Sequence, residues 1–207
     1  MTMKRLWIYR IAVVLLAAGL AAVFLVRNDD AAAEVETAPA VSGWRNIEPA
    51  DVDDNFVKLL HENMGLLTVG DDAIGWGTFG TLWGVPVFNV YVSEDRYTHG
   101  LMEKYDTYTV SFLSKEHRDD VMYLGTHSGR DGDKISQTSL TLAYTESGTP
   151  YFEEAFMVIE CRKQYGAPFD ASRLGEIPAG FYDRSRVTIH SAYAGQIMQI
   201  LVNDDNR

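Results

Sequence analysis

Apolar and polar side chains alternate at every second position in several stretches of this chain. In residues 86–92 every second side chain is Phe or Val, and in 107–113 apolar residues alternate with Thr and Ser. Successive side chains of a strand point to opposite faces, so this period predicts half-buried strands. Further strands are expected at 64–69, 140–144, 156–165 and 186–202, the last with a break near 193–195.

Short helices are expected between some of these strands, at 54–63, 95–105 and 115–124, with Asp95 as the N-terminal cap of the second. Strands and helices do not alternate regularly, as they would in a doubly wound parallel sheet. The pattern therefore favours a mainly β fold with about six strands, a closed antiparallel barrel that carries short helices.

The N-terminus carries an apolar leader. Residues 11–26 are uncharged, and Lys4, Arg5 and Arg10 precede them. This layout is typical of a signal peptide or a short signal anchor, since sixteen residues are fewer than the ~20 that span a bilayer. The alternative is a buried helix of the domain. We expect residues 1–27 to be the leader, 28–43 a flexible linker and 44–207 the folded domain.

The distribution of charge bears on location and partners. The net charge is −11, and the first 28 residues contribute +4, so the remainder carries −15. Cations ahead of the apolar run predict an exported domain, periplasmic or otherwise extracytoplasmic, anchored to the inner membrane if the leader is retained. The acidic body repels DNA and anionic lipid. Nucleic acid is therefore not expected as a partner, and membrane contact is expected only through the leader.

Cysteine and histidine chemistry is sparse. The single cysteine, Cys161, allows no intramolecular disulfide and no four-cysteine zinc site, and its apolar neighbours predict a buried strand residue more than a nucleophile. The five histidines lack the H-x-x-x-H spacing, so no metal site is expected. His190 falls in a predicted strand, where a packed or edge residue is more common than a base.

The segment Gly75–Gly80 matches G-x-G-x-x-G. A dinucleotide fingerprint requires a helix at that turn, and Gly84 and Pro86 prevent one. Two interpretations remain open. The glycines let a ligand approach the backbone while Trp76 and Trp83 wall the site, or the segment is a glycine-rich bend with two core tryptophans.

Two further segments carry cations. Arg96 precedes Tyr97 and Thr98 at a predicted helix start, where free N–H groups favour anions. Residues 128–134 place Arg130 and Lys134 four positions apart, behind Ser128 and Gly129. The alternatives are a solvated arginine and a charged surface loop with internal ion pairs. Bare backbone, aromatic rings, hydroxyls and cations together suit a flat ring system with a phosphate tail, such as FMN.

The order and spacing of these segments are more specific than any one of them. They are Trp44–Pro49, Ile74–Gly77, Trp83–Pro86, Arg96–Thr98, Glu103–Asp106, Thr109–Phe112, Ser128–Asp131 with Asp133 and Lys134, Pro150–Ala155, Ile159–Cys161, and His190 with Tyr193 and Gly195. In this arrangement the chain resembles the flavin reductase-like, FMN-binding split-barrel proteins, specifically the flavoredoxin branch. The resemblance covers residues 44 to about 202.

The resemblance implies a six-stranded antiparallel split β-barrel that follows the leader helix, dimerises and binds FMN noncovalently near the dimer interface. Carried over by position, Trp76 would lie beside the flavin ring, with Gly75, Gly77 and Thr78 next to it. The ring and the phosphate tail would be held by Arg96, Tyr97, Thr98, Ser128, Gly129, Arg130 and Lys134. Phe181 or Tyr182 would cover the flavin, and His190 would lie nearby. Lys134 could also stabilise the anionic reduced flavin.

The implied function is an FMN-dependent oxidoreductase that takes electrons from reduced nicotinamide, NADH or NADPH, or from a protein donor. The flavin would carry the chemistry, so no side chain is named as a catalytic acid or base. The alternatives are a non-enzymatic FMN electron carrier and a barrel that has lost its flavin. The last is suggested by the shortened turn at 70–73, which lacks the family's Asn and Thr, and each lost hydrogen bond would cost about 0.5–1.5 kcal/mol. Gln196 also replaces a usual acidic residue.

Overall fold

The computed structural model describes residues 43–52, 59–60, 65–69, 72–74, 77–185 and 187–207. The chain divides into two compact units, residues 1–39 and 40–207, and every described residue belongs to the second. The predicted leader, nearly all of the linker, Gly75 and Trp76 lie outside the described residues. Among the residues that are described, no helix combines the length and apolar character needed to cross a membrane.

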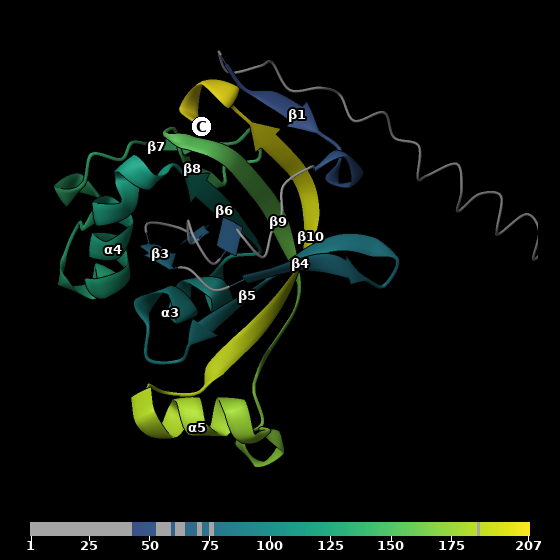
Figure 1. Ribbon diagram of the computed structural model, residues 1–207, viewed down its shortest axis with the longest axis vertical. Helices are drawn as coiled ribbons and strands as arrows, with labels where there is room; N and C mark the ends of the chain where they lie inside the picture. The colour runs from purple at the N-terminus through teal and green to yellow at the C-terminus, as the bar shows by residue number, and fades with distance from the viewer. Residues whose placement is uncertain (1–42, 53–58, 61–64, 70–71, 75–76, 186) are drawn as a thin grey trace, which may run out of the picture. The chain divides into compact units, whose positions relative to one another are not determined.

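The domain is built on an antiparallel sheet of eight strands in the order β3-β2-β6-β9-β10-β5-β4, with β1 paired to β10 (Figure 1). The strands are β1 Arg45–Ile47, β2 Leu66–Val69, β3 Asp72–Ile74, β4 Gly77–Leu82, β5 Val85–Ser93, β6 Thr107–Leu113, β9 Ala155–Pro168 and β10 His190–Val202. A separate hairpin joins β7 Leu142–Tyr144 to β8 Pro150–Phe152. This mainly β, antiparallel fold confirms the sequence-based class and is consistent with a split barrel. The sheet exceeds the expected six strands because three-residue strands such as β1 and β3 are too short to show alternation.

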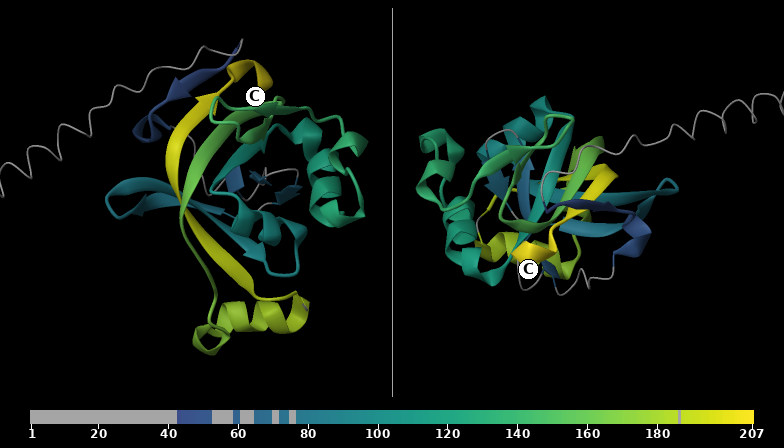
Figure 2. Two further views of the ribbon diagram at one scale, coloured as in Figure 1. Left: turned by 180° about the vertical axis from the view of Figure 1, so that it is seen from behind. Right: turned by 90° about the horizontal axis from the view of Figure 1, so that it is seen from above.

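Three α-helices lie wholly within the described residues: α3 Tyr97–Lys104, α4 Arg118–Thr126 and α5 Glu176–Ser185. Short 3-10 turns are η1 Pro49–Asp51, η2 Lys115–His117, η3 Gly129–Asp131, η4 Ile135–Gln137, η5 Ala171–Arg173 and η6 Asp204–Asn206. Sequence patterns missed α5, which buries no residue and so shows no apolar period. It lies at the end of β9 and β10 away from the C-terminus (Figure 2).

The predicted cap of α3 was wrong. Arg96 is the N-terminal cap of the helix and caps it without a side-chain hydrogen bond. The Asp95 carboxylate instead accepts a hydrogen bond from Ser93 Oγ at 2.7 Å. The helix therefore begins one residue later than the cap prediction requires, and Asp95 belongs to the loop before it.

Strand β6 is buried on both faces, which explains why alternation misjudged it. Tyr108, Val110 and Phe112 lie in the main core cluster, as predicted, but Thr109 and Ser111, predicted to face solvent, are also fully buried. The β7–β8 hairpin supplies the second contact, since Thr109 Oγ1 donates to Pro150 O at 2.6 Å. Buried hydroxyls need such partners. A second apolar cluster lies on this side and includes Trp44, Leu113, Leu124, Tyr151, Phe152 and Val158.

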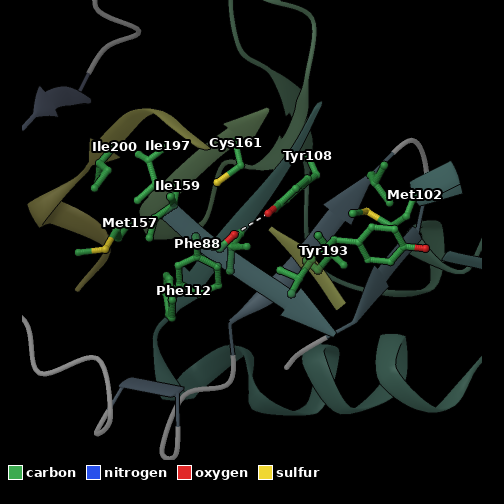
Figure 3. Packing of buried hydrophobic residues seen from close by; sticks show 14 of the residues in the cluster. Phe88, Met102, Tyr108, Phe112, Met157, Ile159, Cys161, Tyr193, Ile197 and Ile200 are labelled. Carbon is green, nitrogen blue, oxygen red and sulfur yellow. Dashed lines mark hydrogen bonds between the residues drawn. The ribbon is translucent and has the colours of Figure 1, made fainter. Parts of the chain in front are cut away.

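Strand β10 closely approaches the side chain of Tyr108 at Gly195, and Tyr108 lies among the core residues of Figure 3. Tyr108 Oη donates to Phe88 O at 2.6 Å, and a methyl group at Gly195 would lie 2.0 Å from that Oη. The register of β9 and β10 shifts between Ala194 and Gly195, so the predicted break is a bulge within a continuous strand. Cys161 is fully buried beside it, and burial raises the pKa of its thiol. It is a strand residue inside the core, as predicted.

The structure corrects the expectations for Trp83 and describes the glycine segment from Gly77 onward. Residues 77–82 form strand β4, which joins β5 through a two-residue turn at Trp83 and Gly84. Their φ angles of 53° and 77° match the primed turns favoured in hairpins, and among the described residues Trp83 alone has a positive φ without being glycine. Its side chain is 62% exposed at the tip of the hairpin. Within this chain Trp83 is therefore neither a core residue nor the wall of an enclosed site.

Candidate functional site

Two arginines join the loop before α3 to the last turn of α4 and the segment that follows it. Arg130 Nη1 donates to Asp95 O at 2.8 Å, and Arg96 Nη1 donates to Gly125 O at 3.4 Å. The bonds run in opposite directions between the same two segments, so two of the cationic motifs predicted from the sequence lie together. Each side chain is exposed, and a guanidinium has five N–H donors. Both arginines can thus hold an anion while they keep these bonds.

Ser128 and Gly129 fix the backbone that carries Arg130. Ser128 Oγ accepts a hydrogen bond from Arg130 N at 3.2 Å and caps the short turn η3, which begins at Gly129. Both residues are half-buried. This hydrogen bond fixes the turn that follows α4 and carries Arg130. It therefore restricts the directions in which the Arg130 side chain can extend.

Tyr97 and Thr98 begin α3, but they occupy different environments. Tyr97 is half-buried and packs against the main core cluster, whereas Thr98 is fully buried. Both residues directly follow Arg96 in the chain, and the side chain of Thr98 lies in the packed interior. Of the three predicted site residues in this motif, Arg96 is the exposed one.

Tyr182, Phe181 and His190 form an aromatic group where α5 returns to β10. Tyr182 Oη lies 3.1 Å from His190 Nδ1 and accepts from the His190 main-chain N–H at 3.4 Å. The Phe181 and Tyr182 rings are 5.3 Å apart in an edge-on arrangement. Tyr182 Oη and His190 Nδ1 thus share one hydrogen bond, whose donor depends on the tautomer of the imidazole.

Electrostatics connect His190 to the Arg96 loop. Burial lowers the pKa of His190, and the positive charge of Arg96 acts in the same direction, while Asp95 opposes both. The Ser93 hydrogen bond in turn lowers the pKa of Asp95. Removal of the charge of Asp95 or Arg96, at the start of α3, should therefore shift the pKa of His190.

A hydroxyl bridge that sequence reasoning missed holds these parts together. Ser93 Oγ lies 2.7 Å from Thr188 Oγ1, which accepts from Asp95 N at 3.2 Å. Thr188 precedes β10, so the bridge links the α5 connection to the loop before α3. A serine two residues before an aspartate at a helix start is a local turn signal, but nothing in the sequence identifies Thr188 as its partner.

Lys134 does not extend into solvent beside Arg130. It is 5% exposed, and its Nζ donates to Leu124 O at 2.8 Å and His127 O at 3.2 Å. The four-residue spacing predicted two cations on one ligand. The two side chains instead bond different main-chain segments.

Gly77 and Thr78 lie in a separate group of contacts. Thr78 Oγ1 lies 3.2 Å from Tyr91 Oη and accepts from Asn89 Nδ2 at 3.2 Å. Asn89 and Ser93 share a face of β5, four residues or roughly 13 Å apart. None of the described contacts joins Thr78 to Arg96 or Arg130. Gly77 has a packing role, since a methyl group there would lie 2.3 Å from the Phe88 ring.

The comparison with known families identifies the domain. Residues 81–207, more than half of the chain, match the model of the flavin reductase like domain. The chain belongs to this family. The match confirms the resemblance seen in the sequence, and the flavin reductase-like domain has a flavin-binding fold. No curated protein matches the chain.

Solved structures similar to this flavin reductase-like domain include an FMN-binding protein from Thermus thermophilus with bound p-hydroxybenzaldehyde, at 23% identity and TM-score 0.52 over 67% of this chain and 70% of that one. The flavoredoxin from Methanosarcina acetivorans is 19% identical, with TM-score 0.53 over 67% of each chain. The flavoredoxin of Desulfovibrio vulgaris is 20% identical, with TM-score 0.53 over 69% and 70%. At these identities the likeness shows a common fold.

The residues of this flavin reductase-like domain fit a phosphate-bearing flavin. Arg96 and Arg130 offer charge-assisted donors on neighbouring segments, and Phe181 and Tyr182 supply aromatic rings beside His190. In the part of the chain that the structure describes, no group of three or more His, Cys, Asp or Glu side chains is arranged to hold a metal ion. The two arginines and the aromatic rings together favour an organic anion with an aromatic portion.

Proposed function

We propose that this domain binds FMN noncovalently and passes electrons through it, as an oxidoreductase, from NADH, NADPH or a protein donor to an acceptor. The observation that carries the proposal is the reciprocal pair of hydrogen bonds by which Arg96 and Arg130 meet in a protein that is otherwise strongly acidic. The acidic protein repels anions, so two arginines gathered in one place indicate that a specific anion binds there. When bound, FMN would supply the electron-transfer chemistry.

The chain's own residues would bind and orient the flavin. Arg96 and Arg130 would hold the phosphate, with Ser128 and Gly129 presenting the backbone around Arg130. Phe181 or Tyr182 would cover the ring, and His190 would set the position of Tyr182 through their mutual hydrogen bond. Gly75, Trp76, Gly77, Thr78, Tyr97 and Thr98 complete the proposed set by the family resemblance.

The second candidate is an electron carrier that exchanges electrons with protein partners and has no activity toward nicotinamides. The predicted export leader favours it, because soluble nicotinamides are scarce outside the cytoplasm. The third candidate is a domain that has lost its flavin, which the missing Asn and Thr of the 70–73 turn favour. We further propose a homodimer of six-stranded barrels with FMN near the interface, and an extracytoplasmic location reached through the leader of residues 1–27 and the linker of residues 28–43.

An absorbance spectrum of the purified full chain, recorded before and after addition of FMN, tests the proposal. A flavin spectrum that remains with the protein on gel filtration is the expected result. A colourless protein that takes up no FMN would instead support loss of the flavin. Oxidation of NADH or NADPH by the loaded protein then separates the oxidoreductase from the carrier, and the elution volume gives the oligomeric state.

A further inference from the structure

The carbonyl oxygens at the end of α4 are satisfied by side chains. Thr126 Oγ1 donates to Tyr123 O at 3.1 Å, Arg96 donates to Gly125 O at 3.4 Å and Lys134 donates to Leu124 O at 2.8 Å. The last carbonyls of a helix have no partner within the helix, and they form the negative end of its dipole. Two cations from different loops therefore meet the same helix end.

The Lys134 ammonium donates to the carbonyls of Leu124 and His127, and each of these residues immediately precedes one that holds or caps an arginine segment. Leu124 precedes Gly125, which accepts the hydrogen bond from Arg96. His127 precedes Ser128, the residue that caps the turn carrying Arg130. The Lys134 ammonium thus lies between the attachment of one arginine and the backbone of the other. Its burial, with only 5% exposed, keeps both bonds away from competing water.

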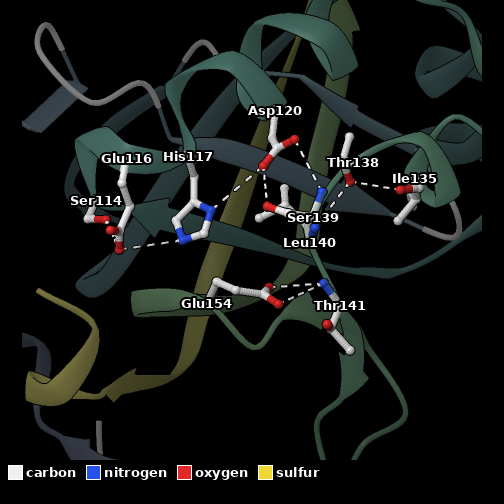
Figure 4. A network of polar contacts seen from close by, with 10 residues as sticks. All are labelled: Ser114, Glu116, His117, Asp120, Ile135, Thr138, Ser139, Leu140, Thr141 and Glu154. Carbon is white, nitrogen blue, oxygen red and sulfur yellow. Dashed lines mark hydrogen bonds and ion pairs between the residues drawn. The ribbon is translucent and has the colours of Figure 1, made fainter.

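The far end of the same loop is anchored independently (Figure 4). Asp120, in the first turn of α4, accepts from Ser139 N at 3.2 Å and from Ser139 Oγ at 2.5 Å. Asp133 Oδ1 accepts from Ile135 N and Ser136 N, both at 3.1 Å. Residues 127–139 are therefore held against α4 at both ends, with Lys134 as the attachment nearest to Arg130.

We propose that Lys134 is a positioning residue: it holds Ser128–Arg130 and the α4 terminus in the geometry that binds the FMN phosphate, and it does not touch the flavin. This inference rests on the proposed function. It replaces the sequence-based hypothesis that Lys134 stabilises the reduced ring, because both of the acceptors given above are main-chain carbonyls. A lysine that contacted the ring would change the reduction potential of the bound flavin, whereas a positioning lysine changes how tightly the phosphate end is held.

The test compares Lys134→Met with Lys134→Arg, Thr126→Val and the exposed control Lys115→Met in the full chain. We expect Lys134→Met to weaken FMN binding about 10-fold, or about 1.4 kcal/mol, and to leave riboflavin binding and the flavin reduction potential unchanged. Lys134→Arg keeps the charge and should retain more of the FMN affinity. Thr126→Val loosens the same helix end without a change of charge, so it should weaken FMN binding in the same selective way.

Amide hydrogen exchange without flavin supplies a readout that is independent of binding. Exchange of residues 123–130 should quicken in Lys134→Met and stay at the wild-type rate in Lys115→Met. A lowered flavin potential with unchanged exchange would overturn the inference and make Lys134 a ligand. If the wild type binds no FMN, the proposed function fails, and unchanged exchange in Lys134→Met would then refute the positioning role by itself. If Lys134→Met does not fold, flavin binding and amide hydrogen exchange of Thr126→Val test the inference instead.

Discussion

Arg130 reaches back across 35 positions of sequence to donate a hydrogen bond from Nη1 to Asp95 O at 2.8 Å. Asp95 immediately precedes Arg96, whose own guanidinium bonds the segment from which Arg130 comes. Each arginine thus bonds the main chain of the part of the molecule that carries the other. The two motifs therefore form one unit, and substitutions in either should change the same property.

Substitution of Arg130 should weaken FMN selectively. Arg130→Met removes a charge-assisted donor worth about 1.5–3 kcal/mol, so the dissociation constant of FMN should rise roughly 10- to 100-fold. Riboflavin, which lacks the phosphate, should bind both proteins alike. Arg45→Met is the matched control, since Arg45 pairs with Asp204 at an exposed surface. Calorimetry with both ligands checks this, and an equal loss for riboflavin would contradict a phosphate role.

Gly195→Ala should destabilise the fold. The added methyl would meet Tyr108 Oη at 2.0 Å and Cys161 Cβ at 2.9 Å inside a packed core, which should cost about 1–3 kcal/mol or more. Gly100→Ala on α3 is the control, because no atom lies within 4 Å of its new methyl, and it should stabilise the helix by about 0.5–1 kcal/mol. Urea unfolding measures both changes. Equal stability of the two variants would refute the close approach.

His190 should make the free energy of unfolding depend on pH. Burial holds its pKa below the ordinary 6.5, so the unfolded chain binds the proton more readily than the folded one. This contribution is complete above pH 6.5 and is lost as the pH falls through the lower folded pKa. Unfolding measured between about pH 5 and about pH 8 should be less pH-dependent in His190→Asn than in the wild type. Identical profiles would exclude the shift.

The buried carboxylate of Glu160 should contribute to stability through its donors. It is 3% exposed and accepts hydrogen bonds from Thr145 Oγ1 at 3.0 Å, from Ser147 and from Gln199, which link the β7–β8 turn to β10. Glu160→Ala removes the acceptor that these three side chains share and should cost about 2–4 kcal/mol. Glu146→Ala, at an exposed position of the same turn, should change the free energy by less than about 0.5 kcal/mol. Thermal unfolding of the two variants compares them.

The sequence predicted the elements whose residues alternate, and it could not predict the pairs that meet only after folding. Phe88, Val90 and Val92 were assigned to one face of β5 by alternation, and all three are buried, whereas Asn89 and Tyr91 on the other face are only half-buried. For β6 the same rule predicted exposed Thr109 and Ser111, since it cannot detect a hairpin that covers the second face. The alternation rule holds only where one side of the sheet meets water.

The candidate site shows a similar division. Arg96, Ser128 and Arg130 were identified by residue type and by resemblance, and the structure brings their segments together. The spacing of Lys134 from Arg130 suggested a shared ligand, but a flexible four-carbon side chain can turn toward a helix end that spacing does not reveal. Thr188 was missed because its bond to Ser93 joins loops far apart in the chain.

Strand β1 pairs with β10, with Arg45 opposite Val202 and Ile47 opposite Ile200. The main-chain groups of β1 can therefore form these hydrogen bonds only after the C-terminal part of β10 has been synthesised. Truncation just before residue 200 would remove all three β10 residues that pair with β1, although every residue of β1 itself would be intact.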